Sequence, residues 1–316
     1  MRQLFLGVDG GQSSTTALIG NETGAVLGAG SGGPCNHVGA AEGSARLSCA
    51  VRECVGQACR QAGLAPDRVH FRAACFGMSG GPADKRAVLS AILSTAQLVV
   101  TDDASIALSG ALAGAPGVIA ISGTGTIAFG RNAQGKMARA GGWGYVFGDE
   151  GSAFDLVRQA IRAALRFEEG WGPPTVLRET LNTAVKAADA NEMLHLMYTV
   201  DWPRSRAAKL AKLVDQAAAD GDDVARELLT DAARQLASLA GAVAGQLWRP
   251  GETVNVAYIG GGFRSRILLD RYRASIEAAG YRCTPPLFPP AGGALFEAYR
   301  AAGMNVLLTG LPDLKS

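Results

Sequence analysis

Residues 4–19 read LFLGVDGGQSSTTALI, and they join a short apolar run to a turn of glycines and hydroxyl side chains. The pattern predicts a strand from Leu4 to Asp9, a turn, and a second strand from Ala17 to Ile19. Glycines let a ligand approach the backbone, hydroxyls donate hydrogen bonds, and the Asp9 carboxylate can hold a divalent cation. The turn therefore suits phosphate with magnesium, although an ordinary Asp-Gly-Gly hairpin turn has the same composition.

The same design returns in the middle of the chain. Val118–Ile121 is predicted as a strand, Ser122–Thr126 as a tight turn rich in hydroxyls, and Ile127–Phe129 as the next strand. Two copies of this arrangement indicate two similar α/β domains, because each turn would offer backbone N–H groups to phosphate. We therefore expect a doubled fold in which two phosphate loops face one shared cleft.

Two carboxylates follow the apolar run Leu98–Thr101, which we predict to be a buried strand. Asp102 and Asp103 stand between this strand and a predicted helix over residues 104–113. Open α/β sheets bind ligands at the carboxyl ends of their strands. One of the two aspartates can cap the helix while the other faces the ligand, and we choose Asp103 for the cleft.

Residues 141–152, GGWGYVFGDEGS, bring together five glycines, an indole and two carboxylates. A core strand would not tolerate so many glycines. A flat Trp face with carboxylate acceptors nearby suits a sugar, which has an apolar face and many hydroxyls. The alternative is a plain glycine-rich turn before a helix that opens at Ser152. In the polar loop 31–39, Asn36 suits a sugar hydroxyl or an acetamido group, or caps that loop.

The spacing of apolar residues predicts a helix over 153–167. Three arginines recur every four residues along it and are interpreted as its solvated face: Arg158, Arg162 and Arg166. Residues 168–202 are less regular and are interpreted as a linker or insertion, because glycines and prolines interrupt them.

Helices are expected again over 204–219 and onward to Leu247. A strand from Val254 to Ile259 then ends in Gly260–Gly262, and glycines there would let the ring or phosphate of adenosine approach the backbone. A last helix, opening at Gly292-Gly293, is expected to pack against the first domain.

Composition excludes several classes of protein. The 316 residues are enough for about two domains, and a net charge of +2 does not favour nucleic acid or a membrane surface as partner. The six cysteines include no C-x-x-C pair and the three histidines have no partner at ligand spacing, so we expect packing residues rather than a metal site. Residues 104–130 are uncharged, but their glycines and Pro116 argue against a membrane span. With no signal peptide evident, we expect a cytoplasmic protein.

Together these motifs resemble the family that includes N-acetylglucosamine kinases and the BadF/BadG-type ATPases, within the sugar kinase and actin superfamily. The resemblance rests on Gly7–Thr15, Asn36-His37, Asp103-Ala104, Ser122–Thr126 and Gly141–Ser152. It implies an α/β, two-lobed, actin-like ATPase fold of ribonuclease H-like lobes with the ligand cleft between them. The implied domains are residues 1–113, residues 114–291 with a helical insertion, and a C-terminal helix in 292–316 that returns to the first lobe. ATP and Mg²⁺ are the implied cofactors.

By that resemblance, Asp103 would be the catalytic base on the sugar hydroxyl and Asp9 would organise Mg²⁺. The residues implied to bind the sugar are Asn36, Asp103, Gly142, Trp143, Gly144 and Asp149. The residues implied to bind the nucleotide are Gly11, Ser13, Ser14, Thr124, Gly125, Ala218, Gly261 and Gly262. The chain departs from the family at Gln12, where relatives commonly have glycine, which leaves the geometry of the first phosphate loop open.

The expected activity is ATP-dependent phosphorylation of an amino sugar, N-acetylglucosamine first, at its 6-hydroxyl, by a homodimer. Glucosamine, N-acetylmuramic acid and glucose remain alternative substrates, because one methyl or hydroxyl group changes discrimination by only about 1 to 3 kcal/mol in an apolar pocket. A BadF-type ATPase activator that passes electrons from an iron–sulfur cluster is a second class, which the cysteines disfavour. A sugar sensor without turnover is a third.

Overall fold

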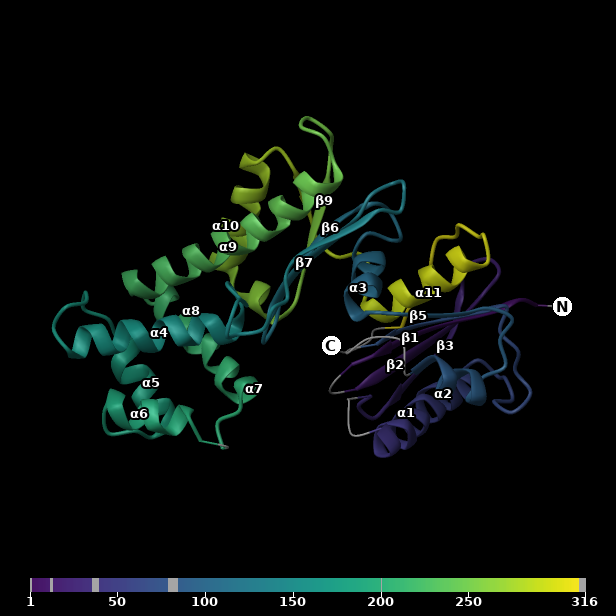
Figure 1. Ribbon diagram of the computed structural model, residues 1–316, viewed down its shortest axis with the longest axis horizontal. Coiled ribbons are helices and arrows are strands. Elements are labelled where there is room, and N and C mark those ends of the chain that lie inside the picture. The colour runs from purple at the N-terminus through teal and green to yellow at the C-terminus, as the bar shows by residue number, and fades with distance from the viewer. Residues whose placement is uncertain (1, 12–13, 36–39, 79–84, 200, 313–316) are drawn as a thin grey trace. The chain divides into compact units, whose positions relative to one another are not determined.

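The computed structural model describes residues 2–11, 14–35, 40–78, 85–199 and 201–312. The chain divides into two compact units, which Figure 1 colours from purple at the N-terminus to yellow at the C-terminus. Unit 1 comprises Met1–Ala115 with Pro286–Ser316, and unit 2 comprises Pro116–Pro285. The domain bounds 1–113, 114–291 and 292–316 remain a prediction about which segments fold on their own.

Unit 1 contains a five-stranded mixed sheet. Its strands are β1 (Leu4–Gly10), β2 (Thr15–Asn21), β3 (Val26–Gly32), β4 (Ala73–Met78) and β5 (Leu98–Thr101). The strands lie in the order β3-β2-β1-β4-β5. β1 and β2 form the predicted hairpin, and β3 pairs antiparallel with β2 in a second one. β4 and β5 run parallel to β1. Because parallel strands end at the same edge of a sheet, the turn after β1 and the residues after β5 share one edge.

Helices cover both faces of this sheet. They are α1 (Ala40–Gln61), α2 (Lys85–Ile92), α3 (Asp103–Ala111) and α11 (Pro290–Ala301). Successive residues of β1 point to opposite faces, so Leu6 and Val8 join the core under α1, whereas Phe5 joins a second core with α3 and α11. Burial on both faces explains why β1 is apolar almost throughout.

The last helix packs directly on the first strand of unit 1. A Cβ at Gly7 would clash with the backbone of Leu295, and one at Gly293 would clash with the carbonyl of Ile106. Glycine at these two positions lets α11 approach β1 and α3 closely. Tyr299 of α11 then packs its ring 4.3 Å from that of Phe5. The C-terminal helix thus belongs to the core of unit 1.

Unit 2 repeats the topology of unit 1. Its strands are β6 (Gly117–Ser122), β7 (Thr126–Arg131), β8 (Met137–Gly141), β9 (Asn255–Ile259) and β10 (Arg282–Thr284), in the order β10-β9-β6-β7-β8. β6, β7 and β8 are antiparallel neighbours, and β9 and β10 continue the sheet in parallel with β6. The predicted α/β fold of two similar units is therefore confirmed.

The helices of unit 2 pack around one large core. They are α4 (Ala153–Glu168), α5 (Leu177–Val185), α6 (Ala190–Met197), α7 (Arg204–Ala207), α8 (Ala211–Ala219), α9 (Asp223–Leu247) and α10 (Arg266–Ala278), with short 3-10 helices at Ala208–Leu210 and Gly261–Arg264. Val243 and Ala240 of α9 share this core with Val118 and Ala128 of the sheet, so α9 covers β6 and β7.

Several sequence-based expectations need correction. Residues 168–202 are not an irregular linker, because α5 and α6 lie within them. The elements β8, α10 and β10 were not predicted. No helix in the described parts of the chain is long and apolar enough to cross a membrane.

Candidate active site

Two carboxylates of unit 1 lie near each other at the carboxyl edge of its sheet. Asp9 is the second-last residue of β1. Asp103 is the first residue of α3, which follows β5 after the N-cap residue Asp102. Burial, and after it the negative charge of Asp103, raises the pKa of the Asp9 carboxyl from its ordinary value of 3.8 to about 6. A cation or a proton at this place would relieve the repulsion between the two carboxylates.

The two adjacent aspartates divide their work as the sequence predicts. Asp102 is the N-cap of α3, and its carboxylate accepts hydrogen bonds from Ser105 N at 2.7 Å and Ser105 Oγ at 3.0 Å. Asp103 has an exposed side chain in the first turn of that helix. The capping role of Asp102 is confirmed, and a role of Asp103 in meeting a ligand remains a prediction.

The first hairpin loop, residues 10–15, is held by its own backbone. Gly11 N donates to Ser14 O at 3.0 Å, and Gly11 O accepts from Cys35 N at 3.1 Å. Ser14 is exposed, whereas the hydroxyl of Thr15 is turned inward and donates to Gly33 O. The hydroxyl of Ser14 is thus accessible to a ligand. Ser13 and Gln12 lie outside the described residues, as does Asn36.

The second hairpin loop, residues 122–126, joins β6 to β7 in unit 2. Gly123 N donates to Gly125 O at 2.9 Å, and Gly123 O accepts from Ala153 N, the first residue of α4. The side chain of Thr124 is exposed, and a Cβ placed on Gly123 would meet no atom within 4 Å. A tight turn with open backbone at the start of a helix can receive an anion.

Asp149 is buried and fixed by two partners. Its side chain is 5% exposed, its φ is 65°, and its Oδ1 accepts from Thr126 N at 3.0 Å. Its Oδ2 pairs with Arg204 Nη2 at 2.9 Å. A Cβ on Gly125 would lie 2.9 Å from Oδ1, so glycine at 125 makes room for this carboxylate. Sequence reasoning found Asp149 but missed Arg204, which is 55 residues away and belongs to no local motif.

The aromatic loop, residues 141–152, presents large side chains to solvent. Trp143 is 64% exposed and Phe147 is 84% exposed. The φ values of Gly142 and Gly144 are 75° and 77°, so these positions need glycine for the path of the backbone. Arg139 lies 4.7 Å from the centre of the Trp143 ring. A plain turn does not account for such exposed aromatic groups, which are typical of binding surfaces.

Arg158 bonds to the aromatic loop. Its interpretation as part of the solvated face of the helix was therefore wrong. Its Nη1 donates to Tyr145 O at 3.0 Å, and its Nη2 pairs with Asp155 Oδ1 at 2.6 Å. Asp155 Oδ2 in turn accepts from Gly151 N at 3.2 Å. The loop is therefore anchored by side chains of α4 as well as by its own turns.

The glycines after β9 have two different reasons to be glycine. A Cβ on Gly260 or on Gly262 would clash with Ser122, so these two residues permit close packing within unit 2. Gly261 has no atom within 4 Å of its Cβ position, and its backbone is open to a ligand. The expectation of an open glycine run is thus met by Gly261, while Gly260 and Gly262 serve packing.

Two neighbouring pockets lie beside these glycines in unit 2. One has a volume of about 180 Å³ and is lined by Gly261, Gly262 and residues of α8 and α4. The other has a volume of about 450 Å³ and is lined by Ala218 and residues of α8, α9 and α10. Asp215 lines both pockets and accepts a hydrogen bond from Ser265 Oγ. The structure thus brings the three residues predicted for adenosine to adjoining pockets.

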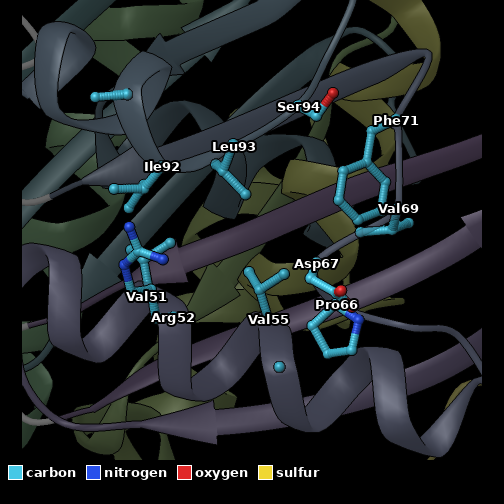
Figure 2. A pocket seen from close by; sticks show the side chains of 12 residues that line it. Val51, Arg52, Val55, Pro66, Asp67, Val69, Phe71, Ile92, Leu93 and Ser94 are labelled. Atoms are coloured by element: carbon cyan, nitrogen blue, oxygen red, sulfur yellow. The ribbon is translucent and has the colours of Figure 1, made fainter.

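A larger pocket, of about 640 Å³, lies elsewhere in unit 1. Figure 2 shows the side chains around it, which come from α1, from residues 66–71 and from residues 92–94. The pocket adjoins the chain just before β4 and β5. Asp9 lies near the carboxyl end of β1, and Asp103 follows the carboxyl end of β5. None of the predicted site residues lines it.

The cysteines are consistent with packing rather than with a metal or cluster site. All six are free, and four of them are buried: Cys35, Cys54, Cys59 and Cys75. Burial raises the pKa of the Cys54 thiol to about 12, which disfavours the thiolate that metals require. Within the described ranges, no three His, Cys, Asp or Glu side chains form a group that could hold a metal ion.

Comparisons with known proteins agree on one family. The model of the BadF/BadG/BcrA/BcrD ATPase family matches residues 6–298. The N-acetylmuramic acid/N-acetylglucosamine kinase of Clostridium acetobutylicum is 36% identical over 169 residues, which are 52% of this chain and 55% of that protein. The chain therefore spans about half the length of this relative. The N-acetyl-D-glucosamine kinase of Dictyostelium discoideum is 29% identical over 257 residues, which are 77% of this chain and 79% of that protein.

A solved structure supports the same assignment. A protein of Chromobacterium violaceum, described as a candidate N-acetylglucosamine kinase, superposes with a TM-score of 0.71 at 28% sequence identity. The match covers 93% of this chain and 98% of that protein, so it includes both units. The repeated five-stranded sheets and the family match over most of the chain lead to one conclusion: the chain belongs to the BadF/BadG/BcrA/BcrD ATPase family.

Proposed function

We propose that this protein is an ATP-dependent kinase that phosphorylates the 6-hydroxyl of an amino sugar, N-acetylglucosamine first. The observation that carries the proposal is the pair of neighbouring carboxylates in unit 1, Asp9 and Asp103, at the edge of the sheet where ligands bind. Phosphoryl transfer to an alcohol needs a cation for the phosphates and a base for the hydroxyl. These two carboxylates offer one group for each task.

Asp103 is the proposed catalytic base. Its side chain is exposed at the start of α3, where it can reach a substrate hydroxyl, while Asp102 is occupied by capping. A base that orients and deprotonates the acceptor hydroxyl typically contributes about 100- to 10,000-fold in rate. Asp103 would take the proton of the sugar O6 as O6 bonds to the γ-phosphorus and the bond from that phosphorus to ADP breaks.

Asp9 is the proposed partner of Mg²⁺. This ion prefers oxygen ligands and commonly takes only one or two carboxylates, because phosphate oxygens and water complete its shell. The raised pKa of Asp9, beside a second carboxylate, fits a site that is most stable when it holds positive charge. When bound, Mg²⁺ would neutralise phosphate charge.

The nucleotide phosphates are proposed to contact the hairpin loops. Gly11, Ser13 and Ser14 would face the phosphates from the first hairpin loop, and Thr124 and Gly125 from the second. The adenosine would occupy the adjoining helix-lined pockets of unit 2 beside Gly261, Gly262 and Ala218, whose volumes are about 180 and 450 Å³.

The sugar is proposed to bind at the aromatic loop. Trp143 would stack on the apolar face of the ring, with Gly142, Gly144 and Asn36 at its polar edge. An ionised carboxylate has about four lone-pair sites, and Thr126 and Arg204 use two of those on Asp149, so it can still accept sugar hydroxyls. The names of the Clostridium and Dictyostelium relatives support an amino sugar as the substrate class.

We further propose a homodimer that works in the cytoplasm. ATP is the donor and the cysteines of the described structure are free thiols, which suits a reducing compartment. Size-exclusion chromatography with light scattering tests the dimer, and fractionation of the source cells tests the cytoplasmic location. A peak at the mass of one chain would contradict the dimer.

The proposed activity is tested by coupled ADP release with Mg-ATP. The panel contains N-acetylglucosamine, glucosamine, N-acetylmuramic acid, N-acetylmannosamine and glucose, with a control that lacks sugar. Release that depends on an amino sugar supports the kinase, and the product's phosphate position is read by NMR. Release that is the same with and without sugar would contradict the proposal and favour an ATPase activator.

A further inference from the structure

Arg204 of unit 2 contacts two separate loops. It comes from the four-residue helix α7, and its Nη2 lies 2.9 Å from Asp149 Oδ2 and 3.4 Å from Thr124 O. The centre of its guanidinium lies 4.6 Å from the centre of the Tyr145 ring. One side chain thus touches the aromatic loop, through Asp149 and Tyr145, and the second hairpin loop, through Thr124.

These contacts are of the kind that hold a fixed geometry. The partner carboxylate is buried, and charge-assisted hydrogen bonds in such surroundings are shorter and stronger than neutral ones. A guanidinium is a planar fork, so it can donate to two acceptors and stack on an aromatic ring at once. The same ring of Tyr145 packs edge-on against Phe154 of α4, at a centroid distance of 5.6 Å.

Arg204 also carries a donor that its surroundings leave unmatched. Its Nε is buried and has no hydrogen-bond partner among the residues that the structure describes. A buried N–H without an acceptor is costly, and native structures usually supply a partner, a water or a ligand. The position of this donor, beside Asp149, is therefore suited to a polar ligand atom or an ordered water at the aromatic loop.

We propose that Arg204 is a positioning residue that couples sugar binding to nucleotide binding. This inference rests on the proposed function, since it assumes sugar at the aromatic loop and nucleotide phosphate at the second hairpin loop. Arg204 orients the carboxylate of Asp149 toward sugar hydroxyls and links it to the carbonyl of Thr124. Phosphate bound at the second hairpin loop would fix the position of Arg204, and Arg204 would then fix the aromatic loop. Binding of either ligand would therefore raise the affinity for the other.

The coupling has a measurable form. If nucleotide lowers the dissociation constant of the sugar by some factor, sugar must lower that of the nucleotide by the same factor. Coupling between sites typically amounts to about 5- to 150-fold. We expect a value in this range for the natural protein and a value near one when the link through Arg204 is broken.

The variants are Arg204→Lys and Arg204→Ala. Lysine keeps the positive charge beside Asp149 but has no planar fork, so it cannot serve Asp149, Thr124 and Tyr145 together. Arg206→Ala is the matched control, because Arg206 lies on the same helix but stacks on Trp202 and donates to Asp201 O. Thermal unfolding followed by circular dichroism verifies that each variant folds. If Arg204→Ala does not fold, Arg204→Lys alone provides the test.

The experiment is calorimetric titration of the full-length protein with N-acetylglucosamine, with and without a non-hydrolysable ATP analogue and Mg²⁺. The steady-state KM values for sugar and ATP are measured on the same preparations. We expect Arg204→Lys to raise the KM for sugar at least about 10-fold, to change kcat less, and to abolish the coupling, while Arg206→Ala behaves as the natural protein.

The possible results separate the two proposals. Normal coupling in folded Arg204→Lys, with a sugar KM within twofold of the natural protein, would overturn the role of Arg204 alone. Equal loss of coupling in Arg206→Ala would also overturn it, because the effect would then belong to α7 as a whole. A natural protein that turns over ATP without regard to any sugar of the panel would overturn the proposed function, and this inference with it.

Discussion

The two units share a strand order but treat their carboxylates differently. In unit 1, burial and, after it, the like charge of Asp103 raise the pKa of Asp9 to about 6. In unit 2, Asp149 is paired with Arg204 and accepts a backbone N–H from Thr126. Asp9 of unit 1 therefore has a raised pKa in a buried place, whereas Asp149 of unit 2 is paired with an arginine and held in one direction.

This difference indicates a division of labour. Carboxylates that repel each other are ready to receive a cation or a proton, which is what metal binding and general-base catalysis require. A carboxylate that is already paired has a fixed direction, which suits recognition of hydroxyls. The proposed function assigns chemistry to carboxylates of unit 1 and sugar recognition to Asp149 of unit 2.

The largest effect is expected from Asp103→Asn in unit 1. The amide cannot accept the proton of the acceptor hydroxyl, so kcat should fall by about 100- to 10,000-fold, with little change in the KM for sugar. The side chain is exposed, so the melting temperature should stay the same. Coupled ADP release measures the rate, and calorimetry measures the stability.

Asp102→Asn provides the matched control for this variant. Asparagine caps helices about as well as aspartate, so the variant should keep both the hydrogen bond to Ser105 N and near-normal turnover. If Asp102→Asn were the inactive variant and Asp103→Asn turned over normally, the assignment of the base within unit 1 would be wrong.

In unit 2, Asp149→Asn should alter recognition rather than chemistry. Hydrogen bonds to a charged group contribute about 1.5 to 3 kcal/mol, so we expect the KM for sugar to rise about 10- to 100-fold while kcat changes less. Steady-state kinetics with sugar and ATP varied in turn provides the measurement. A fall in kcat as large as that of Asp103→Asn, at unchanged KM, would contradict the division between the units.

The glycines after β9 sharpen the description of unit 2. Gly262→Ala would place a Cβ against Ser122 Oγ, so we expect the free energy of unfolding to fall by about 1 to 3 kcal/mol. Gly261→Ala has open space at its Cβ and should fold normally, but it should raise the KM for ATP by about threefold. Urea unfolding and ATP kinetics on both variants measure the two effects. Equal stability of the two variants would contradict the packing argument.

Much of the fold could be predicted from the sequence because its signals are local. The hairpins follow from short apolar runs on either side of glycine and hydroxyl turns, and Asp102 follows a strand and precedes a helix. The helices α5 and α6 were missed because Gly170, Gly172 and two prolines before them are typical of a linker, and the helices begin only afterwards.

The sequence predicts candidate site residues one at a time, but it does not predict how they pair. Glycines at 260 and 262 predicted ligand approach, whereas the structure packs both against Ser122, far away in the sequence. Arg204 carries no sequence signal, because the carboxylate with which it pairs lies 55 residues earlier. Contacts between distant segments arise from the tertiary fold, which no local pattern encodes.

The smallest expected effect is the pH dependence of Asp9. A carboxyl whose folded pKa is about 6, above an ordinary value of 3.8, favours the protonated folded state, so it costs stability progressively as the pH rises from about 4 to above 6. Asp9→Asn removes this cost. After allowance for its partial exposure we expect a gain of about 1 kcal/mol, or about 2 °C, at pH 8.

Mg²⁺ should reduce the same cost in the natural protein by binding beside Asp9. We therefore expect Mg²⁺ to raise the melting temperature of the natural protein at pH 8 more than that of Asp9→Asn. Differential scanning calorimetry at pH 4 and pH 8, with Mg²⁺ or with a chelator, gives the comparison. An Asp9→Asn gain that is larger at pH 4 than at pH 8 would contradict the raised pKa.

The most direct test of the account is sugar-dependent ADP release by the natural protein and by Asp103→Asn on the same panel of sugars. We predict release that requires an amino sugar in the natural protein, yields a 6-phosphate, and falls at least about 100-fold in Asp103→Asn. Release that ignores sugar, or that Asp103→Asn retains in full, would contradict the assignment of chemistry to unit 1.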